Sequence, residues 1–199
     1  MLSFAGAAAL AFGAIFVAEF GDKSQLLILA FATRYPARPV VVGLVVAAAT
    51  IQGLSVVVGA LVGAALPQTA VAVVSGVAFL AVAAWTLRGD DDDDEHAVHA
   101  TGGARRLAGL GLVLTVAGTF IVGELGDKTM LATFALAASQ GALPTWIGSS
   151  AGEIAANLVA VVVGRQVGHR LSPRMVRIGS AALFAVAGVA VLVGTLITG

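Results

Sequence analysis

The sequence predicts an all-α, polytopic membrane protein with six transmembrane helices arranged as two inverted three-helix repeats. Three observations lead to this prediction. First, 59% of the 199 residues are hydrophobic and 11% are charged, which is too few charges to cover a surface in water. Second, six apolar segments are long enough to cross a bilayer, which takes roughly 20 predominantly apolar residues. Third, the second half of the chain repeats the first half.

The six apolar segments, in chain order, are 2–32, 40–66, 69–87, 107–138, 143–164 and 176–197. The first and fourth are interrupted near their middles by charged residues, so we expect these two spans to tilt or break there. Between the third and fourth segments, residues 90–95 are all acidic, as expected of a solvated linker. The sequence therefore predicts a first repeat over 1–88, an acidic linker over 89–106 and a second repeat over 107–199.

The repeat is an internal duplication with a constant offset. Adding 105 to a residue number in the first half gives its counterpart in the second half. The pairs that carry the duplication are Glu19 and Glu124, Asp22 and Asp127, Lys23 and Lys128, Ser24 and Thr129, Pro39 and Pro144, and Phe79 and Phe184. Alanine and valine match by chance in so biased a composition, but a charged cluster does not.

The basic residues predict the orientation. Nine of the eleven Lys and Arg residues lie outside the charged clusters, in or beside the segments 34–38, 88–106 and 165–177, whereas the loops near Pro67 and Gly141 carry no charge. Loops rich in Lys and Arg face the cytoplasm, so we expect both termini outside the cell membrane and the acidic linker in the cytoplasm. Each repeat has an odd number of spans, which inverts the second repeat relative to the first.

The charged residues within the apolar segments form the candidate site. They are Glu19, Asp22, Lys23, Glu124, Asp127, Lys128 and Glu153. A charge at the bilayer centre costs roughly 2.5–3.5 kcal/mol, so these groups are expected to face one another, a wet cavity or an ion. On a continuous helix, the spacing of Glu19, Asp22 and Lys23 places all three on one face. The same spacing recurs in the second repeat.

The charge of the two clusters indicates what they bind. Four carboxylates and two ammonium groups sum to −2, which suits one divalent cation or two protons. Oxygen ligands, in a chain without cysteine, favour Mg²⁺, Ca²⁺ or Mn²⁺ over soft metals. Lys23 and Lys128 would balance surplus negative charge. The alternative is a purely structural set of intrahelical Glu–Lys pairs, which would gain little from burying unpaired Asp residues.

Neutral polar residues extend the candidate site. Gln52 and Asn157 are counterparts, and we interpret them either as part of the ligand shell or as hydrogen-bonding contacts between helices. Ser150, Glu153 and Asn157 are spaced to form one polar stripe on a helix. Glu153, whose counterpart is Ala48, is interpreted as a proton-relay carboxylate, an extra ligand or a plain buried acid. The auxiliary candidates are Gln52, Asn157, Glu153, Ser24 and Thr129.

Two glycine motifs indicate close helix packing. They are Gly59-x-x-x-Gly63 and its counterpart Gly164-x-x-x-Gly168. Motifs of this kind let helix backbones approach each other, either within one protein or in a homodimer.

The segments Glu19-Phe-Gly-Asp-Lys-Ser24 and Glu124-Leu-Gly-Asp-Lys-Thr129 resemble the defining motif, E-x-G-D-[KR]-[ST], of a family of cation/proton exchangers. The family includes Golgi manganese/calcium transporters and bacterial manganese exporters. The resemblance covers nearly the whole chain. It implies that Glu19, Asp22, Glu124 and Asp127 bind the cation, and that Mn²⁺ or Ca²⁺ leaves the cytoplasm in exchange for protons. It does not assign Glu153. From the charge of −2 and the repeat, we expect this exchange to proceed by alternating access.

Other function classes fit less well. An intramembrane aspartyl protease would need glycine where Glu19 and Glu124 stand. An exporter of a small organic solute, such as an amino acid, would not need four acids, and a passive channel would conduct without a linked proton flux. We therefore expect a transporter rather than an enzyme, with no catalytic residues and no resident cofactor. We also expect no nucleic-acid partner, because equal numbers of acidic and basic residues provide no basic field.

Overall fold

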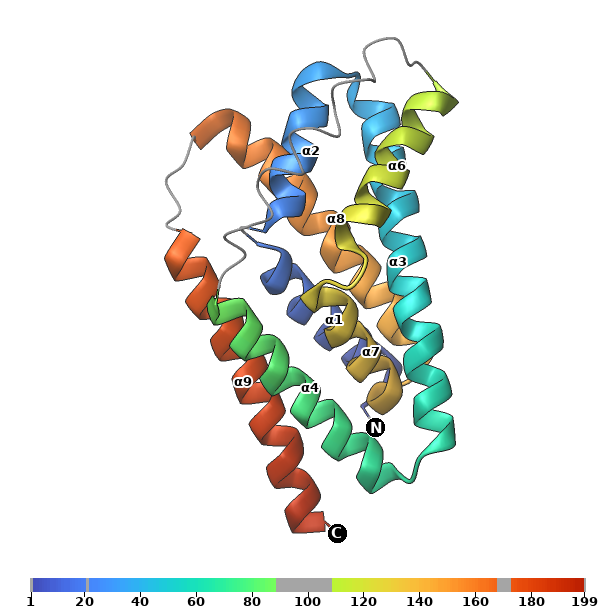
Figure 1. The fold of residues 1–199 in the computed structure, drawn as a ribbon, viewed down its shortest axis with the longest axis vertical. Coiled ribbons are helices and arrows are strands. Elements are labelled where there is room, and N and C mark those ends of the chain that lie inside the picture. The colour runs from blue at the N-terminus through green and yellow to red at the C-terminus, as the bar shows by residue number, and fades with distance from the viewer. Residues whose placement is uncertain (1, 21, 89–108, 168–172, 199) are drawn as a thin grey trace.

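A computed structural model describes residues 2–20, 22–88, 109–167 and 173–198. Within these ranges all regular secondary structure is helical, as the sequence predicts (Figure 1). The helices are α1 (Phe4–Glu19), α2 (Lys23–Arg34), α3 (Ala37–Ala65), α4 (Gln68–Arg88), α6 (Leu110–Glu124), α7 (Lys128–Gln140), α8 (Ala142–Val167) and α9 (Pro173–Thr198). The first predicted segment corresponds to α1 and α2, and the fourth to α6 and α7. The whole predicted linker, 89–106, lies outside the described ranges.

The two charged clusters lie where helices break. α1 ends at Glu19 and α2 begins at Lys23, while α6 ends at Glu124 and α7 begins at Lys128. The axes of α6 and α7 differ in direction by 80°. Gly126 turns the chain there with a φ of +84°, a conformation that glycine adopts without strain.

The first and fourth spans therefore break at the charged residues, as expected, and the arrangement of each cluster on one face, which needs a continuous helix, does not form. The i, i+3, i+4 spacing of Glu124, Asp127 and Lys128 fits a helix, but Asp127 is extended, with φ −73° and ψ 167°, and precedes the first turn of α7. Glu19 and Lys23 likewise end one helix and begin the next. The physical reason in the second repeat is Gly126, whose positive φ lies outside the right-handed helical region and ends the helix before Asp127.

Contacts between the repeats exchange under the 105-residue offset. Gly43 of α3 lies against Val116 of α6, and its counterpart Gly148 of α8 lies against Ala11 of α1, which is the counterpart of Val116. A β-carbon on either glycine would overlap its neighbour, so both helix pairs depend on a small residue for close approach. This exchange is what a two-fold relation between the repeats requires.

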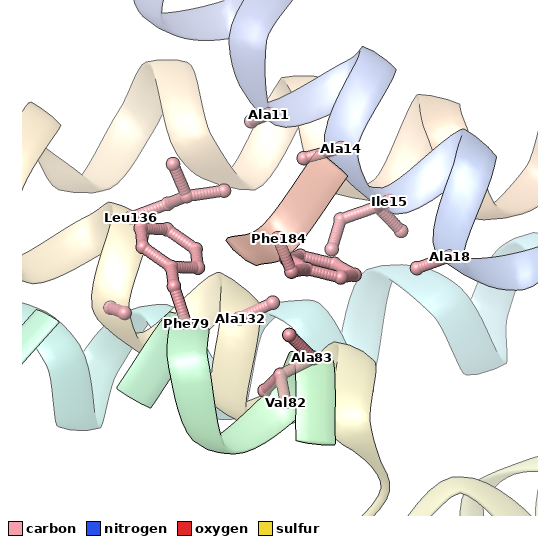
Figure 2. Close-up of a cluster of buried hydrophobic side chains, with 11 residues drawn as sticks. Ala11, Ala14, Ile15, Ala18, Phe79, Val82, Ala83, Ala132, Leu136 and Phe184 are labelled. Carbon is pink, nitrogen blue, oxygen red and sulfur yellow. The ribbon is translucent and has the colours of Figure 1, made fainter. Parts of the chain in front are cut away.

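A second contact relates a residue to its own counterpart. Phe79 of α4 and Phe184 of α9 differ by 105 in number, and their rings stack with centroids 6.1 Å apart (Figure 2). They lie in an apolar cluster with Ile15 of α1 and Leu136 of α7. The α4–α9 pair therefore joins the two repeats through apolar packing.

The surface is that of an integral membrane protein. α3 and α4 are each long and apolar enough to cross a bilayer, and α6 with α7 is a third candidate span if the bent pair counts as one. Large apolar side chains are exposed, for example Leu61 at 66%, Val122 at 75% and Leu196 at 84%. Exposed apolar surface of this kind is stable against lipid and unfavourable in water. Six crossings by two inverted repeats stay a prediction.

The first glycine motif is used inside the protomer. Gly59 lies against the backbone of Phe134, and Gly63 lies against Ala138, so this face of α3 packs on α7. Gly168 of the second motif lies outside the described residues. Because the first motif packs within one chain, it does not support a homodimer, and the homodimer stays a prediction.

Candidate metal centre

The two helix breaks bring acids of both repeats together in the interior. Carboxylate oxygens of Glu19, Glu124 and Asp127 all lie within 4.8 Å of one another. The exposed fractions of these residues are 0%, 2% and 4%, so lipid and bulk water are excluded from the cluster. We call these three residues the acidic cluster. Glu19 and Glu124 are counterparts in the repeat, and their approach is the geometry expected of a site on the axis between two repeats.

The dimensions of the acidic cluster suit a divalent cation. Calcium binds carboxylate oxygens at 2.3–2.6 Å and magnesium at 2.0–2.1 Å, so oxygens on opposite sides of one ion lie about 4–5 Å apart. Oε1 of Glu19 and Oε2 of Glu124 have no hydrogen-bond partner within the described residues, although both are buried. Buried polar atoms are normally satisfied, and a cation between these oxygens would satisfy them.

Asp22 has a different role from the acidic cluster. One of its carboxylate oxygens lies 2.7 Å from Nζ of Lys128, in an ion pair between the two repeats. Both side chains are at most 8% exposed, so the pair is shielded from solvent. Lys128 thus reaches across to the first repeat, which is not the intrahelical pairing that a purely structural reading of the cluster expects. The side chain of Lys23 lies outside the described part of the chain.

A hydroxyl group orients the first glutamate. Oγ of Ser24 donates a hydrogen bond of 2.7 Å to Oε2 of Glu19, which leaves Oε1 for another partner. Thr129, the counterpart of Ser24, is also buried. In a continuous helix, a serine hydroxyl often bonds a backbone carbonyl one turn earlier. Here the break separates Glu19 from Ser24, and the Ser24 hydroxyl bonds the Glu19 carboxylate instead.

Comparison with known proteins identifies this arrangement. The sequence matches the family described as divalent cation/proton antiporter GDT1 over residues 7–94 and 112–198. The chain belongs to this family. The resemblance seen in the two motifs is therefore confirmed, and the GDT1 family is one of transporters rather than enzymes. No solved structure matches the chain.

Several GDT1 relatives align over most of the chain. A protein of Vibrio cholerae serotype O1 named "Putative manganese exporter" is 30% identical over 173 residues, covering 84% of this chain and 81% of its own. A GDT1-like protein of Synechocystis is 31% identical over 189 residues, covering 85% and 88%. The chloroplastic protein PAM71 of Arabidopsis thaliana is 31% identical over 198 residues, covering 88% of this chain and 54% of its own.

The auxiliary candidates of this GDT1 member lie beside the acidic cluster. Nε2 of Gln52 on α3 donates a 2.6 Å hydrogen bond to Oε2 of Glu153 on α8. Glu153 is close enough to Glu19 and Asp127 for their charges to interact. Asn157 donates to the carbonyl of Glu153, one turn earlier in α8. The predicted stripe on α8 is confirmed, since Ser150, Glu153 and Asn157 are all buried.

Two polar residues near the site are not among the predicted ones. Gln25 donates a 3.2 Å hydrogen bond to the carbonyl of Ala156 on α8. Thr133 is fully buried, and its hydroxyl has no partner among the described residues. Thr133 follows Thr129 by four residues, so the helical period of α7 could have identified it. Gln25 gives no such signal, because its counterpart is Met130.

Proposed function

We propose that this GDT1 member exports Mn²⁺ from the cytoplasm in exchange for protons. The observation that carries the proposal is the acidic cluster, in which buried carboxylates of both repeats lie within 4.8 Å of one another. Carboxylate oxygens bind Mn²⁺ and Ca²⁺, and the same oxygens bind protons. We favour Mn²⁺ because a relative that aligns over 84% of this chain is named "Putative manganese exporter".

In this proposal Glu19, Glu124, Asp127 and Asp22 are the metal-binding acids. The acidic cluster holds the ion, and Asp22 joins it when Lys128 moves aside. Lys128 balances the charge of Asp22 when no metal is bound, because a buried carboxylate without a cation is strongly disfavoured. Gln52, Glu153, Asn157, Ser24 and Thr129 support the site by hydrogen bonding and by supplying further oxygens.

The exchange follows from competition for one site. Deprotonated acids bind the cation on the cytoplasmic side, and the two repeats then rearrange so that the site opens to the other side. Protons from that side take the carboxylate oxygens and release the metal, since a carboxylate must lose its proton to bind a cation. Exchange is obligatory if the empty site, holding neither the cation nor protons, cannot reopen to the cytoplasm.

We place the protein in the cell membrane with both termini outside. The N- and C-terminal ends of the described chain lie at one end of the molecule, and α2 runs to α3 at the opposite end, beside Arg34 and Arg38 (Figure 1). Arginine-rich loops face the cytoplasm. The exchange of Gly43 and Gly148 contacts supports two inverted repeats around the site.

Metal-driven proton movement in proteoliposomes tests the proposal. Purified protein is reconstituted with a pH-sensitive dye inside, and Mn²⁺, Ca²⁺, Mg²⁺ or Zn²⁺ is added outside. We expect Mn²⁺ to drive the fastest pH change, and the double variant Asp22→Ala/Asp127→Ala to abolish it. Ser139→Ala is the matched control, because the Ser139 hydroxyl bonds carbonyls of its own helix. Undiminished exchange in the double variant would show that these acids are not the site.

A further inference from the structure

One face of α8 is polar, whereas the counterpart positions on α3, its equivalent in the first repeat, are mostly apolar. Thr145, Ser149, Glu153 and Asn157 follow one another at four-residue intervals along α8, and each is at most 2% exposed. We call these four residues the polar file. Subtracting 105 gives Val40, Leu44, Ala48 and Gln52 of α3, which are equally buried. The two faces have the same place in the fold and opposite chemistry, except at the innermost amide.

The polar file leads from one end of the molecule to the acidic cluster. α8 begins at Ala142, beside the uncharged loop at Gly141, and the file starts three residues later. Twelve residues of helix span about 18 Å, which is more than half of a hydrocarbon core about 30 Å thick. One turn before its inner end, Glu153 accepts a hydrogen bond from Gln52 and interacts with the charges of Glu19 and Asp127.

Several oxygens of this face have no partner in the described structure. They are Oγ1 of Thr145, Oε1 of Glu153 and Oδ1 of Asn157, together with Oγ of the adjacent Ser150. Buried polar atoms in native proteins are paired with protein groups, ordered water or an ion. A face that closes with unpaired oxygens is less stable closed than open, because opening lets water reach them.

On the matching face of α3 that penalty is confined to Oε1 of Gln52 at the inner end, which also has no partner among the described residues. Val40 and Leu44 lie in an apolar cluster with Phe31 of α2 and with Val116 and Phe120 of α6. Apolar packing is favoured when water is excluded, so this side is stable when closed. The repeat thus places a polar wall on one side of the acidic cluster and an apolar seal on the other.

We propose that the polar file is the wall of the route by which protons enter and the cation leaves, and that without metal the protein opens preferentially on this side. The inference rests on the proposed function, and it adds which helix lines the route and which side opens at rest. Under the orientation proposed above, the polar file opens to the outside. The apolar face of α3 would separate in a minor state, which cytoplasmic metal stabilises by binding to the acidic cluster.

Cysteine accessibility tests this inference, and the chain has no cysteine of its own. Single variants Ser149→Cys and Leu44→Cys are reconstituted with a chelator, and a membrane-impermeant charged thiosulfonate is applied to each membrane face in turn. Ser75→Cys is the matched control. Ser75 is seven residues into α4, as Ser149 is into α8, and it is 1% exposed. The Ser75 hydroxyl donates to the carbonyl of Ala135 on a different helix, α7, whereas the Ser149 hydroxyl donates to the carbonyl of Trp146 in its own helix.

We expect Ser149→Cys to react from the face at which α8 begins, at least about tenfold faster than Ser75→Cys there or Leu44→Cys from the opposite face. The factor follows from a minor open state that is at most about 10% populated. Equal rates for Ser149→Cys and Ser75→Cys would overturn the inference, as would equal rates for Ser149→Cys and Leu44→Cys. Each variant must elute as a single species, and Thr145→Cys replaces Ser149→Cys if the latter does not fold.

This result is separable from the proposed function. Wild-type protein that moves no protons in response to metal would refute the exchange, whatever the labelling pattern. Symmetric labelling in protein that exchanges Mn²⁺ for protons would refute the polar file as the preferred route and leave the exchange standing.

Discussion

Two substitutions of similar chemistry in the candidate metal centre should change stability in opposite directions. Glu124→Gln and Asp22→Asn each replace one buried carboxylate with an amide of nearly the same shape. Glu124 lies within 4.8 Å of two other acids, whereas Asp22 forms an ion pair with Lys128. In metal-free protein, the first change removes repulsion and the second removes attraction.

The magnitudes follow from these distances. Two ionised groups 4.8 Å apart repel by about 3.5 kcal/mol at an effective dielectric constant near 20. Glu124 takes part in two such pairs, and proton uptake by a neighbouring acid relieves part of the repulsion, so we expect Glu124→Gln to stabilise the metal-free protein by about 3 kcal/mol. Breaking a buried ion pair destabilises by about 3–5 kcal/mol, which sets the expectation for Asp22→Asn.

Thermal unfolding of the purified protein in detergent measures both effects, with chelator present and one fixed scan rate. For a chain of this size, 3 kcal/mol corresponds to about 6–12 °C in the unfolding midpoint. We expect Glu124→Gln to raise the midpoint and Asp22→Asn to lower it. Added Mn²⁺ should raise the wild-type midpoint and leave that of Glu124→Gln unchanged. A lower midpoint for metal-free Glu124→Gln would refute the argument that the acidic cluster is repulsive without a cation.

Three further outcomes are expected. Gly148→Ala should destabilise the protein because its β-carbon would overlap the backbone of Ala8, whereas Gly13→Ala, which meets nothing within 4 Å, should leave the unfolding midpoint unchanged or raised. Ser24→Ala should weaken Mn²⁺ binding about tenfold in a titration, because Glu19 loses a hydrogen bond worth about 1.5 kcal/mol; unchanged affinity would exclude the orienting role. The Mn²⁺ dissociation constant should rise steadily as the pH is lowered, since protons compete for the carboxylates, and a pH-independent constant would contradict exchange at one site.

Much of the fold can be predicted from the sequence because the duplication leaves a visible register. The offset that aligns Glu19 with Glu124 also relates Gly43 to Gly148 and Phe79 to Phe184, and all three pairs lie in matching environments or in mutual contact. The high energy of isolated charges in lipid further requires the clusters to meet. These two arguments need no knowledge of loop geometry.

The details at the helix breaks could not be predicted in the same way. A spacing of i, i+3, i+4 fits a continuous helix and a cap followed by a new helix equally well, so Asp127 gives no warning that it precedes α7. The contact of Glu153 with Gln52 joins different repeats, and the counterpart of Glu153 is Ala48, so the duplication does not reveal it. The pairing of Lys128 with Asp22 likewise depends on how the repeats pack.

The most direct test of the central claim is the number of Mn²⁺ ions that each chain binds, measured by electron paramagnetic resonance during titration. If acids of both repeats form one site, wild-type protein binds one ion per chain, and Glu19→Gln and Glu124→Gln each lose it. Two ions per wild-type chain, or one ion retained in both variants, would mean that each repeat carries its own site, and would contradict the shared metal centre.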